Sequence, residues 1–307
     1  MKSLKKFGVL ALCAVMAVLF AGCGVTIGAG PNRQDLSSMI RTVYSKVVSI
    51  ETSENTAGSG VIIYSYQDTG YVIIATNMHV ITKPVIGGGR AFFDTIDVIN
   101  WSEGLLRGEY DTRRNQNPHP LAVYTTPKIK IANAGVPDDN VVLYADWEQD
   151  LAIIKFKINH ANSAAFVNQA VTLREDSPRV GEPIAAMGYS FGEFHRTSVG
   201  VVTQLFSTRT FPDGVRPSHV FMHDATTIFG NSGGPVFDAS GKVVGLTTMI
   251  VMMRCSECKP NERCCDTPAL GYSIAISSRH IASIVNEHAG CWGLTGSTHD
   301  PDCKLCP

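Results

Sequence analysis

A serine flanked by glycines is the strongest chemical signal in the sequence. It lies in the segment Gly230-Asn231-Ser232-Gly233-Gly234-Pro235. A nucleophilic serine needs its hydroxyl on a tight turn, with backbone N–H groups directed at the place where an oxyanion forms. Glycines on both sides permit the backbone angles and the close approach that such a turn requires. The segment therefore predicts an activated serine at position 232.

Two other segments contain the residue types that activate a serine. In Ala75-Thr76-Asn77-Met78-His79-Val80 a histidine follows an apolar run, and in Asp150-Leu151-Ala152-Ile153-Ile154-Lys155 an aspartate precedes a buried strand. A histidine can take the proton of the serine, and a carboxylate fixes the tautomer of that histidine. Asp94 and Asp97 are competing acids in a less readable stretch. We expect His79 and Asp150 to activate Ser232.

The first 22 residues have the composition of an export signal. Lysines near the start precede an apolar run of 14 residues, Phe7–Phe20, which is too short to span a bilayer comfortably. The following Ala21-Gly22-Cys23 resembles the processing site of bacterial lipoproteins, where the cysteine is acylated, for example with palmitate. We predict a signal peptide over 1–22, a lipidated Cys23 and a tether over 23–34. The alternative is an ordinary secretory signal, and with either the protein leaves the cytoplasm.

Composition and charge describe a globular protein. Of the 307 residues, 44% are hydrophobic and 17% are charged, and the formal net charge is -1. This composition allows a sizeable core. A nucleic-acid partner would require a clustered basic surface, for which the sequence gives no sign. No cofactor and no catalytic metal ion are expected.

Short runs of β-type residues dominate the chain between residues 60 and 276. About twelve runs are separated by glycine, proline, asparagine and aspartate, which is typical of an all-β sandwich or barrel pair. One helix is predicted before them, with Asp35 as its cap, and another after them, with Ser277 or Ser278 as its cap and Gly290 beyond its end. The predicted strands are Gly60–Tyr66, Tyr71–Thr76, Asp97–Trp101, Lys128–Ala132, Val141–Tyr144, Leu151–Lys157, Pro183–Tyr189, Ser198–Phe206, His219–His223, Pro235–Asp238, Lys242–Met249 and Tyr272–Ile276.

Six segments together resemble trypsin-like serine proteases of the HtrA (high-temperature requirement) type. They are the three segments described first and Gly58–Ile62, Gly245–Thr248 and Gly271–Ile276. The order histidine, aspartate, serine is also that of chymotrypsin. The resemblance implies an all-β fold of two six-stranded antiparallel barrels with the catalytic groups between them. It places a protease domain over 35–290 and leaves a Cys-rich tail over 291–307.

The resemblance assigns a role to individual residues. Ser232 is the nucleophile, His79 the general base and then acid, and Asp150 the group that orients His79. The oxyanion hole is the segment Gly230, Asn231 and Ser232, with N–H groups from the first and the last. Relatives activated from a zymogen have an aspartate in place of Asn231, paired with a freed N-terminus. The asparagine predicts that this switch is missing here.

The same resemblance locates the pocket for the substrate residue before the scissile bond. Its expected lining is Thr226, Leu246, Thr247 and Tyr272. No acid stands at the expected floor, Thr226, and Asp224 is expected to point elsewhere, so a buried substrate cation would have no partner. Leu246 is expected to narrow the pocket. We therefore expect cleavage after small or medium aliphatic residues such as Val, Ala, Ile or Thr.

Seven cysteines lie near the C-terminal end, beyond the signal peptide and Cys23. In an oxidising compartment disulfides are favoured for them. Two Cys-x-x-Cys pairs also have zinc-ribbon spacing, and free thiols remain a third possibility. Since seven is odd, one thiol is expected to be free or paired with another chain. The disulfide candidates are Cys255, Cys258, Cys264, Cys265, Cys291, Cys303 and Cys306.

Two features differ from the resembling proteases. No PDZ module is expected after the closing helix, and residues 83–140 are predicted to form a long surface insert that covers the cleft or binds a partner. We expect a serine endopeptidase that cleaves exported or unfolded polypeptides at the cell envelope, held to a membrane by lipid (the outer membrane in a Gram-negative host). The alternative is a proteolytically silent surface lipoprotein that uses the fold for binding or adhesion. The sequence carries no signal of oligomeric state.

Overall fold

The structure is a computed structural model of the chain. It describes residues 35–65, 70–86, 88–101, 123–125, 129–130, 141–157, 166, 169–191, 194–208, 210, 215–253, 267–292 and 294.

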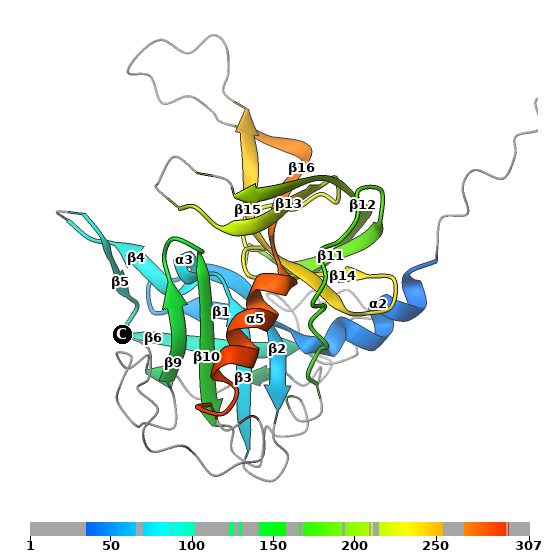
Figure 1. Cartoon of the computed structure of the whole chain (residues 1–307). Coiled ribbons are helices and arrows are strands. Elements are labelled where there is room, and N and C mark those ends of the chain that lie inside the picture. Colours follow the sequence, from blue (N-terminus) through cyan, green and yellow to red (C-terminus); the bar gives the residue numbers. More distant parts are fainter. Residues whose placement is uncertain are drawn as a thin grey trace, which may run out of the picture. The chain divides into compact units, whose positions relative to one another are not determined.

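An antiparallel sheet of eight strands forms the N-terminal half (Figure 1). The strand order is β7-β6-β1-β2-β3-β10-β9, and β8 pairs with β6. Valine and isoleucine, which suit a pleated and buried surface, dominate the central strands. The strands are β1 (Val47–Thr52), β2 (Ala57–Ser65), β3 (Tyr71–Thr76), β6 (Thr95–Trp101), β7 (Val123–Thr125), β8 (Ile129–Lys130), β9 (Val141–Asp146) and β10 (Leu151–Lys157).

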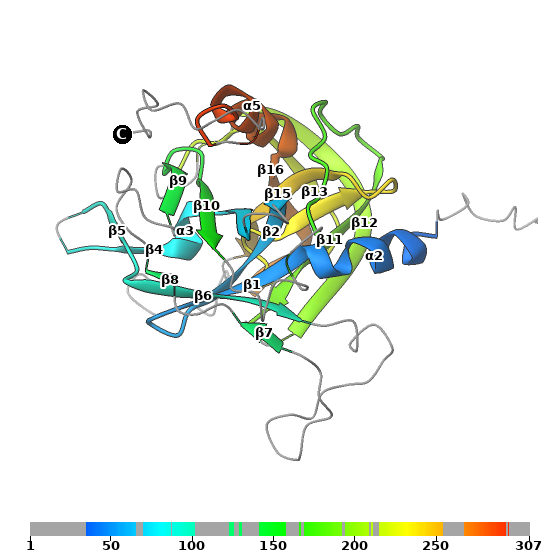
Figure 2. The same ribbon diagram turned by 90° about the horizontal axis from the view of Figure 1, so that it is seen from below.

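A closed barrel of six antiparallel strands forms the C-terminal half. Its order is β11-β12-β13-β16-β15-β14, so every strand has a partner on both sides. The barrel meets the sheet where β11 packs against β1 and β2 (Figures 1 and 2). The strands are β11 (Pro183–Ser190), β12 (Phe194–Thr208), β13 (Ser218–His223), β14 (Pro235–Asp238), β15 (Val243–Met253) and β16 (Thr267–Ser277).

The prediction of two closed six-stranded barrels is confirmed for the C-terminal half only. In the described part of the N-terminal half, no pairing joins β9 to β7 or β8, so this sheet keeps two edges. The predicted surface insert over 83–140 also needs correction. Strand β6 lies inside it, pairs with β1, and buries Ile96 and Val98 in the core of the sheet. This part of the range is therefore integral to the fold.

Four short helical elements connect or cover the two halves. They are α2 (Ser37–Val43), the 3₁₀ turn η1 (Tyr44–Lys46), α3 (Met78–Ile81) and α5 (Ser278–His288). The predicted cap of the closing helix is confirmed, because the Ser277 side chain accepts a hydrogen bond from the Arg279 N–H. The predicted Asp35 cap is wrong: Leu36 occupies the cap position of α2 and makes no side-chain cap bond. Two strands, β4 (Thr82–Pro84) and β5 (Arg90–Phe92), form a separate hairpin after α3.

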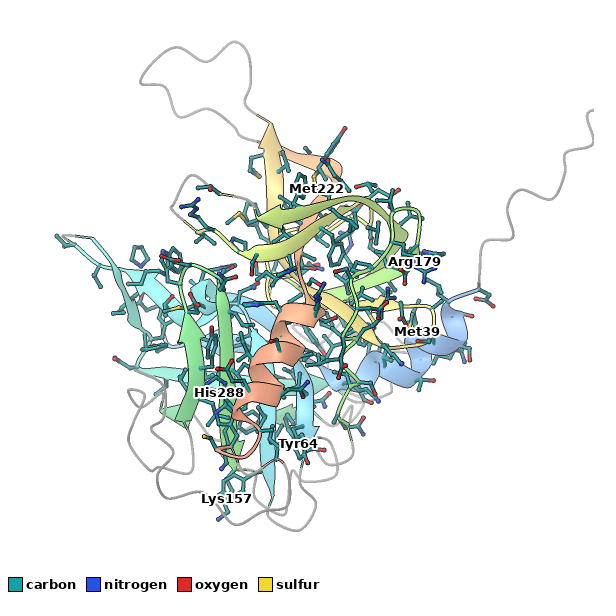
Figure 3. The ribbon with its side chains drawn as sticks, viewed as in Figure 1. Met39, Tyr64, Lys157, Arg179, Met222 and His288 are labelled. Atoms are coloured by element: carbon teal, nitrogen blue, oxygen red, sulfur yellow. The ribbon has the colours of Figure 1, made fainter. Side chains whose placement is uncertain are left out.

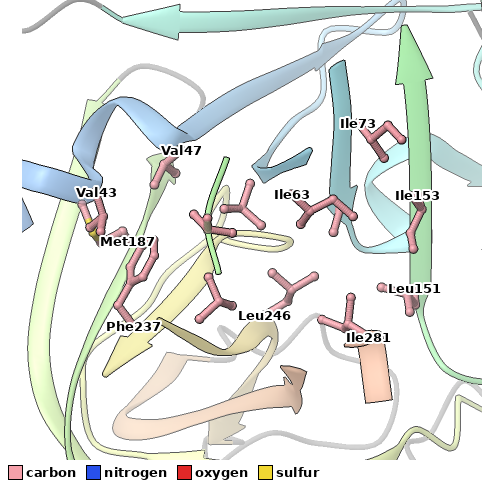
Figure 4. Packing of buried hydrophobic residues seen from close by; sticks show 14 of the residues in the cluster. Val43, Val47, Ile63, Ile73, Leu151, Ile153, Met187, Phe237, Leu246 and Ile281 are labelled. Carbon is pink, nitrogen blue, oxygen red and sulfur yellow. The ribbon is translucent and has the colours of Figure 1, made fainter. Parts of the chain in front are cut away.

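One hydrophobic cluster is shared by the two halves (Figure 4). Ile73, Leu151 and Ile153 enter it from the sheet, and Met187 and Leu246 enter it from the barrel. The closing helix α5 adds Ile281 to this cluster. The ring of His288, also in α5, lies edge-on to Tyr144 of β9, with ring centres 6.2 Å apart (Figure 3). Burial of this apolar surface holds the sheet, the barrel and α5 together.

Candidate active site

His79 and Asp150 lie at adjacent ends of two paired strands. Strand β3 pairs with β10 so that Thr76 lies opposite Ala152, and the chain leaves β3 into α3 beside the start of β10. His79 Nδ1 lies 2.8 Å from Asp150 Oδ2 and 3.0 Å from Oδ1. The His79 backbone N–H also donates to Oδ1, at 3.0 Å. When Nδ1–H donates to this carboxylate, Nε2 is the ring nitrogen that can accept a proton.

A third donor to the Asp150 carboxylate comes from the barrel. Thr248, a buried residue of β15, donates a short hydrogen bond from Oγ1 to Oδ2. Asp150 is only 1% exposed and has a φ of +51°, and the Asn77 side-chain amide donates to its carbonyl at 2.9 Å. The carboxylate is therefore oriented by both halves of the protein. The sequence analysis placed Thr248 in a motif but gave it no role.

Ser232 lies in the turn between β13 and β14, against the N-terminal sheet. The next residue, Gly233, has a φ of +80°, and a Cβ there would lie 2.2 Å from Ser59 O and 2.2 Å from Thr76 Oγ1. Only glycine permits this approach, which brings the serine turn to the segment that carries His79. No hydrogen bond joins Ser232 Oγ to His79 Nε2 in the described part of the chain. In serine hydrolases this bond is often long in the free protein and tightens when substrate binds.

The turn before Ser232 leaves two N–H groups available. Gly230 has a φ of +92°, and Asn231 N–H closes the turn by donating to the carbonyl three residues earlier, at 3.1 Å. The Phe229 carbonyl accepts from Phe191 N–H at 2.9 Å, and in a trans peptide the Gly230 N–H points the opposite way. Among the described residues, Gly230 N–H and Ser232 N–H have no acceptor. Asn231, included in the predicted oxyanion segment, has its own N–H occupied.

Two serines outside the predicted site hold this turn. The buried Ser59 hydroxyl donates to Gly230 O at 2.7 Å and accepts from Tyr189 N–H at 2.8 Å. Ser190 Oγ donates to Asn231 Oδ1 at 2.8 Å. The side-chain oxygen of Asn231 thus accepts its hydrogen bond from a neutral hydroxyl. Sequence reasoning missed both serines, although Ser59 lies in one of the six resembling segments.

The family follows from a comparison with known domains. The model of the trypsin-like peptidase domain matches residues 58–246, a range that contains His79, Asp150 and Ser232. The chain belongs to this family. The matched range begins in β2 and ends in β15, so it includes strands of both halves.

Individual relatives match shorter parts of the peptidase domain. A probable periplasmic serine endoprotease of the DegP-like type from Brucella suis is 35% identical over 121 residues, which cover 39% of this chain and 22% of the relative. The magnetosome formation protease MamE of Magnetospirillum gryphiswaldense is 29% identical over 203 residues, 59% of this chain and 25% of the relative. The chain thus spans about a quarter of the length of these relatives.

The fold of the peptidase domain has solved counterparts. The structure of the HtrA-type protease AlgW with a tripeptide superposes with a TM-score of 0.52 at 21% identity. It covers 83% of this chain and 64% of the AlgW chain. This likeness concerns the fold.

The hairpin β4–β5 of the peptidase domain reaches the acid–base pair. Arg90 donates to Thr82 O and to Thr82 Oγ1, each at 2.8 Å, and to His79 O at 3.4 Å. Its guanidinium lies 4.4 Å from the centre of the Trp147 ring. Trp147 O accepts the Asp150 N–H at 3.1 Å. Arg90 therefore links the segment of His79 to the segment of Asp150, a contact that the sequence did not reveal.

The four predicted pocket residues do not share one environment. Leu246 is fully buried in the shared core, so the prediction that it narrows the pocket is wrong (Figure 4). Thr247 is 2% exposed, Thr226 is half-buried and Tyr272 is 55% exposed. The reason is the register of β15, which directs Thr248 at the Asp150 carboxylate.

The strand beyond Thr248 is less buried than residues 243–248. Its next two residues, Met249 and Ile250, are half-buried. Asp224, the acid nearest to the pocket in sequence, accepts a hydrogen bond from Val201 N–H of β12 at 2.6 Å. Its carboxylate is therefore engaged away from Thr226, as the sequence analysis expected.

Several predicted features lie outside the described residues. These are the signal peptide, Cys23, and all the disulfide candidates except Cys291, which is disulfide-bonded. Within the described ranges, no group of histidine, cysteine and acidic side chains is arranged to hold a metal ion. No helix in those ranges has the length and apolar character needed to cross a membrane.

Proposed function

We propose that the protein is a serine endopeptidase with Ser232 as nucleophile, His79 as base and Asp150 as orienting acid. The carrying observation is the bond from His79 Nδ1 to the buried Asp150 carboxylate at 2.8 Å. In the first step Ser232 Oγ attacks the scissile carbonyl and its proton passes to His79 Nε2. His79 then protonates the leaving amine, and a water molecule activated by the same nitrogen hydrolyses the acyl-enzyme.

The oxyanion of each tetrahedral intermediate is assigned to Gly230 N–H and Ser232 N–H. Both N–H groups lack an acceptor in the described residues, and the Ser59 hydroxyl fixes the Gly230 carbonyl at 2.7 Å. Preorganised donors of this kind stabilise developing charge without reorganisation. Asp150, oriented by Thr248, stabilises the imidazolium that forms on His79.

The proposed substrates are exported or unfolded polypeptides at the cell envelope. The Brucella suis relative is named a probable periplasmic protease, and the N-terminal sequence of this chain has the composition of an export signal. We further propose that Cys23 carries the lipid anchor. Several acyl chains on one residue would anchor the protein firmly, because one chain alone binds only weakly.

We propose that cleavage follows small or medium aliphatic residues. The support is that the Asp224 carboxylate accepts a hydrogen bond from Val201 N–H and is therefore engaged there. Profiling with a peptide library measures this preference. Cleavage mainly after Lys or Arg contradicts it.

A fluorophosphonate probe tests the activity itself. The wild-type protein should be labelled and Ser232→Ala should not be. Ser232→Ala and His79→Ala should each lower turnover by about 10⁴ to 10⁶, and the double variant should lose little more, because the residues act as a unit. Circular dichroism checks that both variants are folded. A wild-type protein that is neither labelled nor active on any peptide contradicts the proposal.

Lipid anchoring has an independent test. Wild-type protein expressed with its signal should enter the detergent phase of a phase-separation extraction. Cys23→Ser should stay in the aqueous phase, and Cys13→Ser, a cysteine inside the predicted signal, serves as the matched control. A Cys23→Ser protein recovered in the detergent phase contradicts the anchor.

A further inference from the structure

Two large apolar side chains are exposed directly beside the oxyanion turn. Phe191, at the end of β11, is 63% exposed, and Phe229, in the turn itself, is 58% exposed. Phe229 directly precedes Gly230 and lies three residues before Ser232. Exposed phenylalanines next to the reacting groups call for an explanation, since two aromatic rings in water gain nothing for the fold.

The backbone fixes these two residues against each other. Phe191 N–H donates to Phe229 O at 2.9 Å. A Cβ at Gly230 would lie 2.5 Å from Phe191 N, so the end of β11 packs directly on the turn. Phe191 also has a φ of +56°, a left-handed conformation that is unfavourable for a bulky side chain. Such an outlier is found mostly where function needs a side chain in a particular place.

Strand order shows which side of Ser232 these rings occupy. In the barrel, β14 lies between β15 and β11, and the serine turn leads into β14. Strand β15 carries Thr248, which is bonded to Asp150, and its continuation at Met249 and Ile250 borders the side proposed for the residue before the scissile bond. The end of β11 is on the opposite side of the turn. A substrate that starts along β15 and crosses Ser232 therefore runs toward Phe191 and Phe229.

We propose that Phe191 and Phe229 form an apolar subsite for the substrate residues that follow the scissile bond. This inference rests on the proposed peptidase function and deepens it. The ligand class is a polypeptide with a large aliphatic or aromatic residue at the first or second position after the cleaved bond. Each phenylalanine offers a large apolar surface, and only an apolar substrate side chain gains by covering it. Residues of this kind become accessible when a protein unfolds, which agrees with the proposed substrates.

The test compares substrates that differ only after the scissile bond. Internally quenched peptides carry one fixed acyl-side sequence, followed by Leu-Phe or by Ser-Ser. The measured quantity is the ratio of kcat/KM for the two peptides. The wild type should prefer Leu-Phe, and Phe191→Asn with Phe229→Ser should lower the ratio about tenfold, the usual scale of apolar pocket contacts. Asparagine is chosen at 191 because it tolerates a positive φ.

A matched control removes exposed apolar surface elsewhere on the barrel. Val199 and Leu205 of β12 are 58% and 44% exposed. Val199→Ser with Leu205→Ser should leave the ratio unchanged. Because the ratio compares two substrates of one enzyme, a general loss of activity in a variant does not affect it.

Three outcomes overturn the inference. The first is a wild-type ratio near one, the second a ratio that the phenylalanine variant leaves unchanged, and the third a self-associating wild type that becomes monomeric in that variant with the ratio preserved. Light scattering measures the last. A p-nitroanilide substrate, which has no residue after the scissile bond, separates the two proposals. If the wild type hydrolyses it but shows no preference among the peptides, the subsite fails and the peptidase function stands.

Discussion

The closed barrel and the open sheet contribute different parts of the site. The sheet supplies the base and the acid, and the bonds between His79 and Asp150 are internal to it. The barrel supplies Ser232 and the two N–H groups beside it. Each half also has its own hydrophobic cluster, in addition to the shared one. The proposed acid–base pair and the proposed nucleophile therefore lie on different halves, which meet where Ser59 of the sheet bonds to the turn of Ser232.

Two buried residues make polar contacts between the halves next to the site. Ser59 of the sheet bonds to Gly230 through its hydroxyl and to Ser232 O through its N–H at 2.7 Å. In the opposite direction, Thr248 of the barrel bonds to Asp150. Substitutions at these contacts should affect turnover more than stability, whereas equally buried residues away from them should do the reverse. Gly233, Ser59 and Thr248 belong to this junction, and each has a matched residue outside it.

The largest effect is expected at Gly233. Alanine there would place Cβ 2.2 Å from Ser59 O, a backbone atom that cannot move aside, and would retain the unfavourable φ of +80°. We expect kcat/KM to fall by more than about 10³, the scale for loss of a positioned catalytic group. Gly181→Ala is the control, because Gly181 has a φ of +85° but open space around its Cβ position. It should cost about 1 kcal/mol of stability and leave turnover intact. Equal activity losses in both variants would contradict a special role for the junction.

A smaller effect is expected for Ser59→Ala. It removes the hydroxyl that joins Tyr189 N–H to Gly230 O and leaves both groups unpaired inside the protein. The cost is about 1 to 3 kcal/mol. Because Gly230 bears an oxyanion donor, we expect much of this cost in kcat, as a loss of about 10- to 100-fold. Ser49→Ala is the matched control, since Ser49 is equally buried and its Oγ has no hydrogen-bond partner. Turnover and chemical unfolding measured together would show whether the two serines differ.

Thr248 and Thr247 offer the sharpest comparison because they are neighbours on one buried strand. Thr248 Oγ1 donates to Asp150, whereas Thr247 Oγ1 is buried and has no hydrogen-bond partner among the described residues. Replacing either by valine keeps the shape of the side chain. We expect Thr248→Val to lower kcat about tenfold, the equivalent of one hydrogen bond to a charged group. Thr247→Val should retain kcat and match or exceed the wild-type stability. A loss of kcat in Thr247→Val alone would contradict the role given to Thr248.

The smallest effect concerns stability and pH in the barrel. In the described part of the chain the ring nitrogens of His195 have no hydrogen-bond partner. The ring lies against Tyr44 and Tyr189, with ring centres 3.8 and 5.0 Å away. Burial lowers its pKa to about 3. The unfolded chain binds a proton here below about pH 6.5, while the folded protein does not, so stability falls as the pH drops from 6.5 toward 3. The slope from this residue is at most about 1.4 kcal/mol per pH unit.

Urea unfolding at pH 7.5, 6 and 5 measures this slope. His195→Phe should flatten the dependence while keeping an aromatic ring between the two tyrosines. Equal slopes in wild type and His195→Phe would contradict the assignment. Burial also lowers the pKa of His223 to about 4, so part of the acid sensitivity should persist in the variant.

Strong local patterns made much of the fold predictable. Strands β3, β10 and β14 have the predicted bounds because continuous apolar runs end there at polar or turn residues. Strand β1 was missed: Val47–Thr52 directly follows a helical segment, with no turn residue to mark its start. The short strands β4, β5 and β7 were also missed, since three residues carry too little pattern.

Site residues could be predicted where the residue type alone indicates a role. They could not be predicted where the pairing register of a strand determines which side chain faces the site. The histidine and aspartate segments predicted the pair His79 and Asp150, which the structure joins by hydrogen bonds. Leu246 was misplaced because it pairs with Ile276 and its side chain lies in the shared hydrophobic cluster, and sequence does not show which face of a strand each side chain takes. Ser59 and Arg90 act through contacts between residues far apart in the chain, which local patterns do not contain.

The hydrogen bond from Ser190 to Asn231 has a consequence for when the protein becomes active. Both partners are neutral and neither titrates between pH 5 and 10. We therefore expect the oxyanion turn to hold its shape without a newly cut amino terminus, so that the folded protein is active with no cleavage to activate it.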